Sequence, residues 1–120
     1  LLLAAGMVGV AALYLMIEPL LRFAAGPEYV AAAPLAVVQG FAVVLMLNAA
    51  VLRSALLAMG QDRAVLSSVL VATLCFHATA FTAIPHIGAM GANVAHIVLS
   101  AVWLIAMYLA FRRRIAGAKP

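Results

Sequence analysis

The sequence is short of charged residues. Asp and Glu together number 3, Lys and Arg number 7, and charged side chains make up 8% of the 120 residues. Soluble domains carry about a quarter charged and about half apolar residues, whereas here 69% of the residues are hydrophobic and the mean hydropathy is +1.25. The composition therefore excludes an ordinary soluble domain and indicates an integral membrane protein.

Cysteine and acidic residues are the scarcest reactive groups. The single cysteine, Cys75, lies within an apolar run, so the sequence offers neither a disulfide framework nor a thiol metal site. Glu18, Glu28 and Asp62 fall at the ends of apolar runs, so no carboxylate suited to cation coupling is visible within a span. The sequence also lacks a Ser/His/Asp set, a paired-carboxylate site and a phosphate-binding glycine loop. We therefore expect no enzyme, no cofactor and no metal site.

Long apolar runs are what the sequence has in abundance. About 20 apolar residues cross the roughly 30 Å hydrocarbon layer of a membrane, and the polar break Met59-Gly60-Gln61-Asp62-Arg63 separates two such runs. This break predicts the turn of a membrane hairpin. The whole chain predicts an all-α polytopic membrane protein with spans over residues 1–20, 30–59, 64–84 and 89–111, followed by a basic tail at 112–120.

Prolines and glycines divide the spans from one another. Pro19 predicts a kink or an end in the first helix, and the Gly26-Pro27 step forbids a continuous helix into the second. We expect Pro85 to terminate the third span, with a compact loop over 86–91 leading into the fourth. The tail over 115–120 is expected to be disordered.

Positive charges predict the orientation of the spans. One side carries Arg63, Arg112, Arg113, Arg114 and Lys119, whereas the other carries only Arg22. The excess of positive charge marks the cytoplasmic side, so we expect a multi-pass protein of the inner membrane with a cytoplasmic C-terminus and no nucleic-acid partner. The chain begins inside an apolar helix pattern without an initiator methionine, so we expect the C-terminal piece of a longer protein.

Four segments resemble the C-terminal end of the polysaccharide-type lipid-linked oligosaccharide flippases, a branch of the multidrug/oligosaccharidyl-lipid/polysaccharide exporter superfamily. The segments are the loop and alanine-rich helix start over 23–34, the turn over 58–63, the link Ile84-Pro85-His86-Ile87-Gly88-Ala89-Met90-Gly91-Ala92, and the basic tail. The first segment departs from the family pattern because Ala24 and Ala25 replace a direct Phe-Gly step.

The resemblance implies a two-lobe transporter, of which the four helices form part of one lobe. Such proteins move polyprenyl-pyrophosphate-linked oligosaccharides across the inner membrane by alternating access, for the synthesis of O-antigen, capsule or exopolysaccharide. The partners implied are the lipid-linked oligosaccharide, membrane lipids and a missing N-terminal lobe of the same chain.

Arg53 and Gln39 are candidate substrate-binding residues, since a pyrophosphate head needs cationic or donor groups facing an internal cavity. They share a stripe with Met46 at seven-residue spacing. Arg53 is also close enough to the cytoplasmic end of its span for its side chain to reach the membrane surface. Asn48 falls on the opposite side, where we expect a bond to a neighbouring helix.

His77 and His96 are the remaining candidates, on the third and fourth spans at a similar expected depth. Thr73 shares a face with His77, and a broad face with His96 carries Asn93, Ser100 and Trp103. We expect inter-helix hydrogen bonding from these histidines, with cavity lining or proton sensing as the alternatives. A facing pair would also suit haem or a metal, but further ligands or carboxylates are lacking.

Two other functions fit the sequence. A cation-coupled multidrug exporter of the same superfamily would need carboxylates elsewhere in its membrane helices. A complete small four-helix membrane protein, acting as a haem-binding or assembly subunit, would need the two histidines to face each other.

Overall fold

The chain is built of helices. The computed structural model describes residues 2–117, so Leu1 and Lys119 of the expected first span and basic tail lie outside the described part. The elements are α1 (Leu2–Ala24), the short 3₁₀ helix η1 (Pro27–Ala32), α2 (Ala33–Ala58), α3 (Asp62–Ile87) and α4 (Ala89–Ala116). Described residues form no strand, and the all-α fold expected from the sequence is confirmed.

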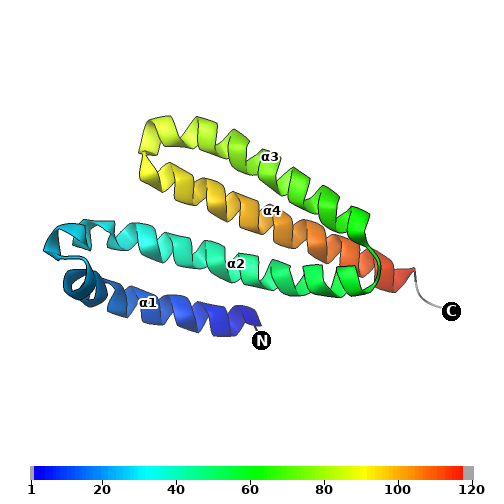
Figure 1. The fold of residues 1–120 in the computed structure, drawn as a ribbon, viewed down its shortest axis with the longest axis horizontal. Helices are drawn as coiled ribbons and strands as arrows, with labels where there is room; N and C mark the ends of the chain where they lie inside the picture. The colour runs from blue at the N-terminus through cyan, green and yellow to red at the C-terminus, as the bar shows by residue number, and fades with distance from the viewer. Residues whose placement is uncertain (1, 118–120) are drawn as a thin grey trace.

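Successive helices run in opposite directions, and their order in space differs from their order in the sequence. Figure 1 shows α4 lying between α2 and α3, while α1 packs on the far side of α2. The beginning of α1, the turn between α2 and α3, and the end of α4 lie at one end of the bundle. The Cα atoms span 61 × 33 × 16 Å, so the arrangement is flat.

Each of the four long helices can cross a membrane. At about 1.5 Å per residue, the 26 residues of α2 or α3 extend about 39 Å, more than the roughly 30 Å hydrocarbon layer. All four helices meet the length and hydropathy expected of membrane spans. The protein is a multi-pass membrane protein.

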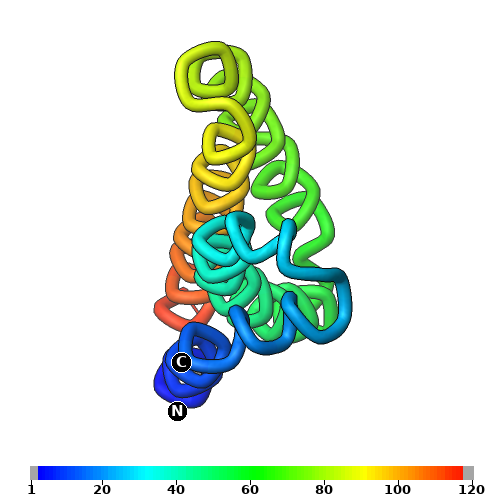
Figure 2. The backbone as a smooth tube through the Cα atoms, turned by 90° about the vertical axis from the view of Figure 1, so that its left-hand side faces the viewer, coloured from blue at the N-terminus to red at the C-terminus, as the bar shows by residue number. Residues whose placement is uncertain are grey.

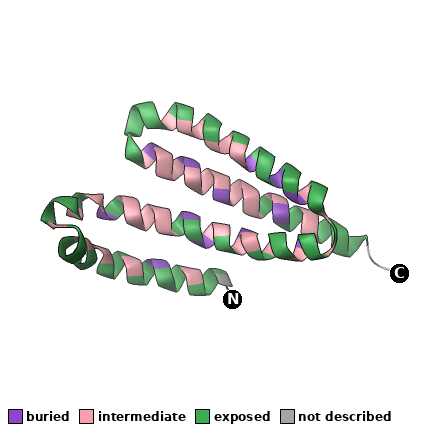
Figure 3. Ribbon diagram, in the orientation of Figure 1, coloured by how far each residue is buried: buried purple, intermediate pink, exposed green. Residues whose placement is uncertain are grey.

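Burial is confined to thin seams between neighbouring helices (Figure 3). A cluster of buried apolar side chains joins three helices through Leu56 of α2, Val65 of α3 and Met107 of α4, with Trp103 packed against it. Large apolar side chains elsewhere are exposed, including Phe23 at 93%. Such surfaces are stable in lipid, where the solvent is itself apolar.

Pro19 and Pro85 lie inside helices. Pro19 falls within α1, and Figure 2 shows the last turns of α1 leaving the direction of the rest of the helix. A proline lacks the N–H that bonds the preceding turn and bends a helix where it occurs, so the first of the two expectations for Pro19, a kink, is met. Pro85 does not terminate the third span as expected, because α3 continues to Ile87.

Gly60 and Gly88, both with positive φ, form the tight turns. At Gly60, with φ 67°, the Gln61 N–H bonds the Leu56 carbonyl and the Gly60 N–H bonds the Leu57 carbonyl, each at 2.9 Å. This pair of bonds is a Schellman motif, with glycine in the left-handed conformation. The expected loop over 86–91 contracts to Gly88 alone, at φ 54° and ψ −135°.

The expected second span and tail can be compared with the helices. The second candidate span extends over Pro27–Ala58, where η1 leads directly into α2 and Pro34 occupies the first turn of α2. The chain is not disordered from residue 115, since α4 continues through Ala116 and Gly117 closes it with a bond to the Arg113 carbonyl.

Candidate functional site

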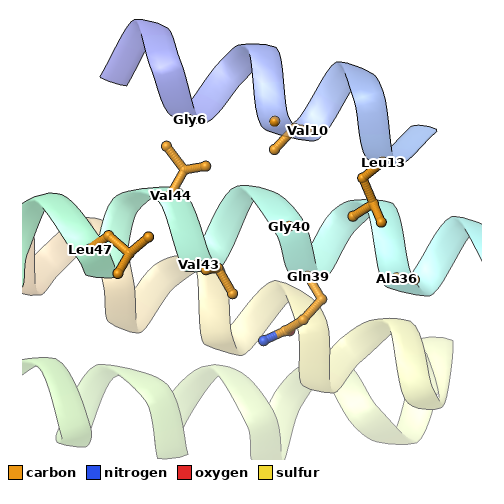
Figure 4. A pocket seen from close by; sticks show the side chains of 10 residues that line it. Gly6, Val10, Leu13, Ala36, Gln39, Gly40, Val43, Val44 and Leu47 are labelled. Atoms are coloured by element: carbon orange, nitrogen blue, oxygen red, sulfur yellow. The ribbon is translucent and has the colours of Figure 1, made fainter. Parts of the chain in front are cut away.

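A polar contact between α2 and α4 joins two of the four candidate residues. The side-chain Nε2 of Gln39 lies 2.6 Å from Nδ1 of His96. An amide nitrogen can only donate, so Nδ1 of His96 is the acceptor and the neutral ring carries its proton on Nε2. Figure 4 shows Gln39 leaving α2 on the side away from α1, toward α4. The inter-helix hydrogen bond expected of His96 is therefore present.

A second bond joins the same two helices one turn away. Asn93 Nδ2 donates to the backbone carbonyl of Leu35 at 2.7 Å. Asn93 and His96 are three residues apart on α4, and Leu35 and Gln39 are four apart on α2, so each pair shares one helix face. We call these four residues the polar seam. Gln39 is about 9 Å from the start of α2 at Ala33, so the bond to His96 joins two helices inside their candidate membrane spans.

Ser100 and Trp103 continue the face of α4 that carries the polar seam. Ser100 is fully buried, and Trp103 is half-buried beside the cluster of Leu56 and Met107. The face predicted from Asn93, His96, Ser100 and Trp103 is thus turned toward neighbouring helices. Among the described residues, Ser100 Oγ and Trp103 Nε1 have no hydrogen-bond partner.

His77 lies apart from the polar seam. Its Nδ1 is 2.8 Å from the Thr73 carbonyl on its own helix, its side chain is exposed, and the Phe76 ring lies edge-on at 5.2 Å between centroids. The face shared with Thr73 is confirmed. The inter-helix bond expected of His77 is not formed within the described residues, and the two histidines do not make the facing pair that haem or a metal would need.

His77 is also deeper than the sequence indicated. It lies ten residues from the end of α3 at Ile87, which is about 15 Å at 1.5 Å per residue. His96 lies seven residues from the start of α4 at Ala89, about 10 Å by the same rise. The difference arises because α3 continues through Pro85.

Arg53 and Asn48 of α2 both lie outside the polar seam. Arg53 is exposed, five residues before Ala58 at the end of the helix, or about 8 Å. Fourteen residues, about 21 Å of helix, separate it from Gln39, so the structure does not bring them together. Asn48 Nδ2 donates to the Val44 carbonyl of its own helix at 2.8 Å, rather than to a neighbouring helix as expected.

An apolar groove of about 430 Å³ runs between α1 and α2. Two glycines let α1 and α2 approach each other closely along the groove. A Cβ at Gly6 would collide with the Val44 side chain, and one at Gly40 would lie 3.2 Å from Leu13. Gln39 is the one polar residue along the groove, but its side-chain amide points away from α1 and bonds His96 (Figure 4). The other lining residues are Gly6, Gly9, Val10, Leu13, Ala36, Gly40, Val43, Val44 and Leu47.

Charge is concentrated at the end of the bundle that holds the α2–α3 turn. Arg63 follows that turn and Arg112 to Arg114 lie in the last turns of α4, all exposed. The Arg112 guanidinium lies 5.9 Å from the centroid of the Tyr108 ring, within cation–π range. Residues 2–117 contain no group of three His, Cys, Asp or Glu side chains placed to hold a metal ion.

Asn93 is the functional-site residue whose partner the sequence did not reveal. Its three-residue spacing from His96 placed both on one face, but the carbonyl that it bonds carries no sequence signal.

In comparisons with known proteins, no family model, curated protein or solved structure matched the chain. The flippase resemblance therefore stands on the short segments that suggested it.

Proposed function

We propose that the chain is part of a transporter that moves polyprenyl-pyrophosphate-linked oligosaccharide across the inner membrane, with the C-terminus in the cytoplasm. Support comes from the motif resemblance, from four membrane-crossing helices and from polar side chains placed within them. Transport helices carry such groups because a charged head must pass a layer of low dielectric. The remaining lobe and the lipid-linked substrate are the partners of this proposal.

The observation that carries the proposal is the position of Arg53. A permanent cation lies exposed on a membrane-crossing helix, about 8 Å from its end, and no acidic side chain among residues 2–117 forms an ion pair with it. A guanidinium offers five N–H donors in a planar fork that matches phosphate oxygens. Arg53 therefore suits the pyrophosphate head at the entrance from the cytoplasmic side.

Replacing Arg53 by Gln and by Lys in the full-length protein tests this role. Surface polysaccharide is the readout, and Arg63→Gln is the matched control because Arg63 is exposed in the first turn of α3, at the very end of its span. We expect Arg53→Gln to lower export at least about tenfold, the effect of roughly 1.4 kcal/mol, and Lys to retain part of it. Unchanged export with Gln, at equal protein level in the membrane, would leave Arg53 as a surface anchor and remove the proposal's main support.

No specific observation favours the two alternatives. A haem-binding subunit needs two histidines directed at one iron, whereas His77 bonds its own helix and His96 bonds Gln39. A cation-coupled drug exporter needs membrane carboxylates. Glu28 and Asp62 lie exposed in the first turns of η1 and α3, and Glu18 is exposed six residues before the end of α1, about 9 Å along the helix.

A further inference from the structure

The hydrogen bond of His77 fixes which ring nitrogen is available to a partner. Nδ1 lies 2.8 Å from the backbone carbonyl of Thr73. A carbonyl oxygen can only accept, so Nδ1 carries the proton and the neutral ring presents the Nε2 lone pair. The described residues give this lone pair no donor. His77 therefore presents an unsatisfied acceptor on the exposed side of α3.

Large exposed apolar side chains surround His77 on its face of α3, and the residue lies near the middle of a candidate membrane span. Leu70, Leu74 and Phe81 share its helix face and are 59%, 62% and 78% exposed. His77 is ten residues from the end of a 26-residue helix, so it falls within about 5 Å of the helix midpoint at 1.5 Å per residue. An acceptor at this depth is unfavourable in hydrocarbon, which contains no donor to replace water.

We propose that a transmembrane helix other than α1 to α4 packs on the face of α3 defined by Leu70, Leu74, His77 and Phe81. This helix donates an N–H or O–H hydrogen bond to His77 Nε2. The donor is the side chain of Ser, Thr, Asn or Gln, which are among the residue types that form hydrogen bonds between membrane helices. This inference concerns assembly and does not depend on the transported substrate.

Two other occupants of this face are less compatible with the geometry. Lipid tails supply no donor. A second copy related by a two-fold axis along the membrane normal would place the same face at the same depth. His77 would then meet its own counterpart, and two Nε2 acceptors facing each other cannot form a hydrogen bond. The partner helix must therefore differ from α3.

Photo-crosslinking in intact membranes tests the proposal. A benzophenone side chain is placed at Leu74, which lies on the His77 face and is 62% exposed. The control places it at Leu15 of α1, which is 74% exposed. The expected product at Leu74 is a crosslink to one membrane-spanning peptide, identified by mass spectrometry, with a donor residue at the depth of His77. The Leu15 control is not expected to give the same product.

The hydrogen bond is tested by substituting His77 in the Leu74 crosslinking variant. His77→Phe keeps a planar ring without an acceptor, whereas His77→Gln restores an acceptor oxygen. We expect Phe to lower the crosslink yield roughly threefold to thirtyfold, the range for one inter-helix hydrogen bond in a membrane, and Gln to restore most of it. Equal yields from the histidine, Phe and Gln forms would overturn the role of Nε2.

Three further outcomes would overturn the docking proposal. Crosslinks to lipid alone would show that the face is bare. A crosslink to α3 of a second copy would replace the proposed helix by a homodimer. Labelling of Leu74→Cys by a membrane-impermeant maleimide, in a Cys75→Ser background, would show that His77 faces water. His77 is exposed, so we expect its substitutions to leave the fold intact. An unchanged melting temperature of each purified variant verifies this.

Discussion

Gln39 of α2 and His96 of α4 form a 2.6 Å hydrogen bond across 57 residues of sequence. The bond joins the two central helices of the flat bundle, since α4 lies between α2 and α3. Together with the bond from Asn93 to the Leu35 carbonyl, it gives these helices a defined register. Apolar packing in lipid is less specific, because lipid tails compete for the same contacts.

The coupling between Gln39 and His96 is measurable by a double-mutant cycle. We expect the single variants Gln39→Leu and His96→Leu to lower the free energy of unfolding, and the pair to show a coupling energy of about 0.6–2 kcal/mol. Unfolding in mixed detergent micelles is the measurement. Asn48→Leu is the control partner, because Asn48 bonds only its own helix, and its coupling to His96→Leu should be near zero. A coupling energy near zero for both cycles would contradict the inter-helix bond.

Gly91 is the position where the α3–α4 hairpin tolerates no side chain. A Cβ there would lie 2.6 Å from the Ala83 carbonyl carbon and 2.7 Å from the Ile84 backbone nitrogen. Backbone cannot move aside as a flexible side chain can, so Gly91→Ala is expected to lower the unfolding free energy by about 1–3 kcal/mol.

The matched control for Gly91 is Gly9, within α1. A Cβ at Gly9 has no neighbour within 4 Å, so Gly9→Ala should be neutral or stabilising by about 0.5–1 kcal/mol through helix propensity. Equal destabilisation by the two alanines would indicate that propensity, and not the close approach of α3 and α4, decides the effect.

The number and type of the helices follow from the sequence, because four apolar runs separated by polar or glycine-containing breaks have few other solutions. Their ends were less predictable. Pro85 lies in the last turn of α3, where few hydrogen bonds remain to be lost, and the positive φ of Gly88 ends the helix instead. A proline near a helix end thus marks the end less sharply than a glycine does.

The partners of the polar residues were harder to predict than the faces on which they lie. Spacing correctly grouped Asn93 with His96, and Thr73 with His77. It could not tell which helix each face meets, because the order α1, α2, α4, α3 in space is set by packing rather than by local pattern. The two histidines therefore look equivalent in sequence, although one is bonded to α2 and the other is exposed.

Gly60 and Gly88 are expected to differ in which substitutions they accept. Gly60 has φ 67°, in the left-handed region that asparagine also adopts. Gly60→Ala should lower the unfolding free energy by about 1–2 kcal/mol, and Gly60→Asn by less. Gly88 combines φ 54° with ψ −135°, close to a region open essentially to glycine alone, so both substitutions there should cost about 1–3 kcal/mol. An asparagine as unfavourable as alanine at Gly60 would contradict the Schellman turn.

The last prediction concerns the side of the membrane at which each turn lies. In a Cys75→Ser background, single cysteines at Asp62 and Ala116 mark one end of the bundle, and cysteines at Glu28 and Ala89 mark the other. The arginines near the first pair predict a cytoplasmic location for it. An impermeant maleimide should therefore label Glu28→Cys and Ala89→Cys in intact cells, and Asp62→Cys and Ala116→Cys only in inverted vesicles. Because α3 and α4 together cross the membrane twice, labelling of Asp62→Cys and Ala116→Cys from opposite sides would contradict the fold. Labelling of all four cysteines from the sides opposite to those expected would contradict only the orientation.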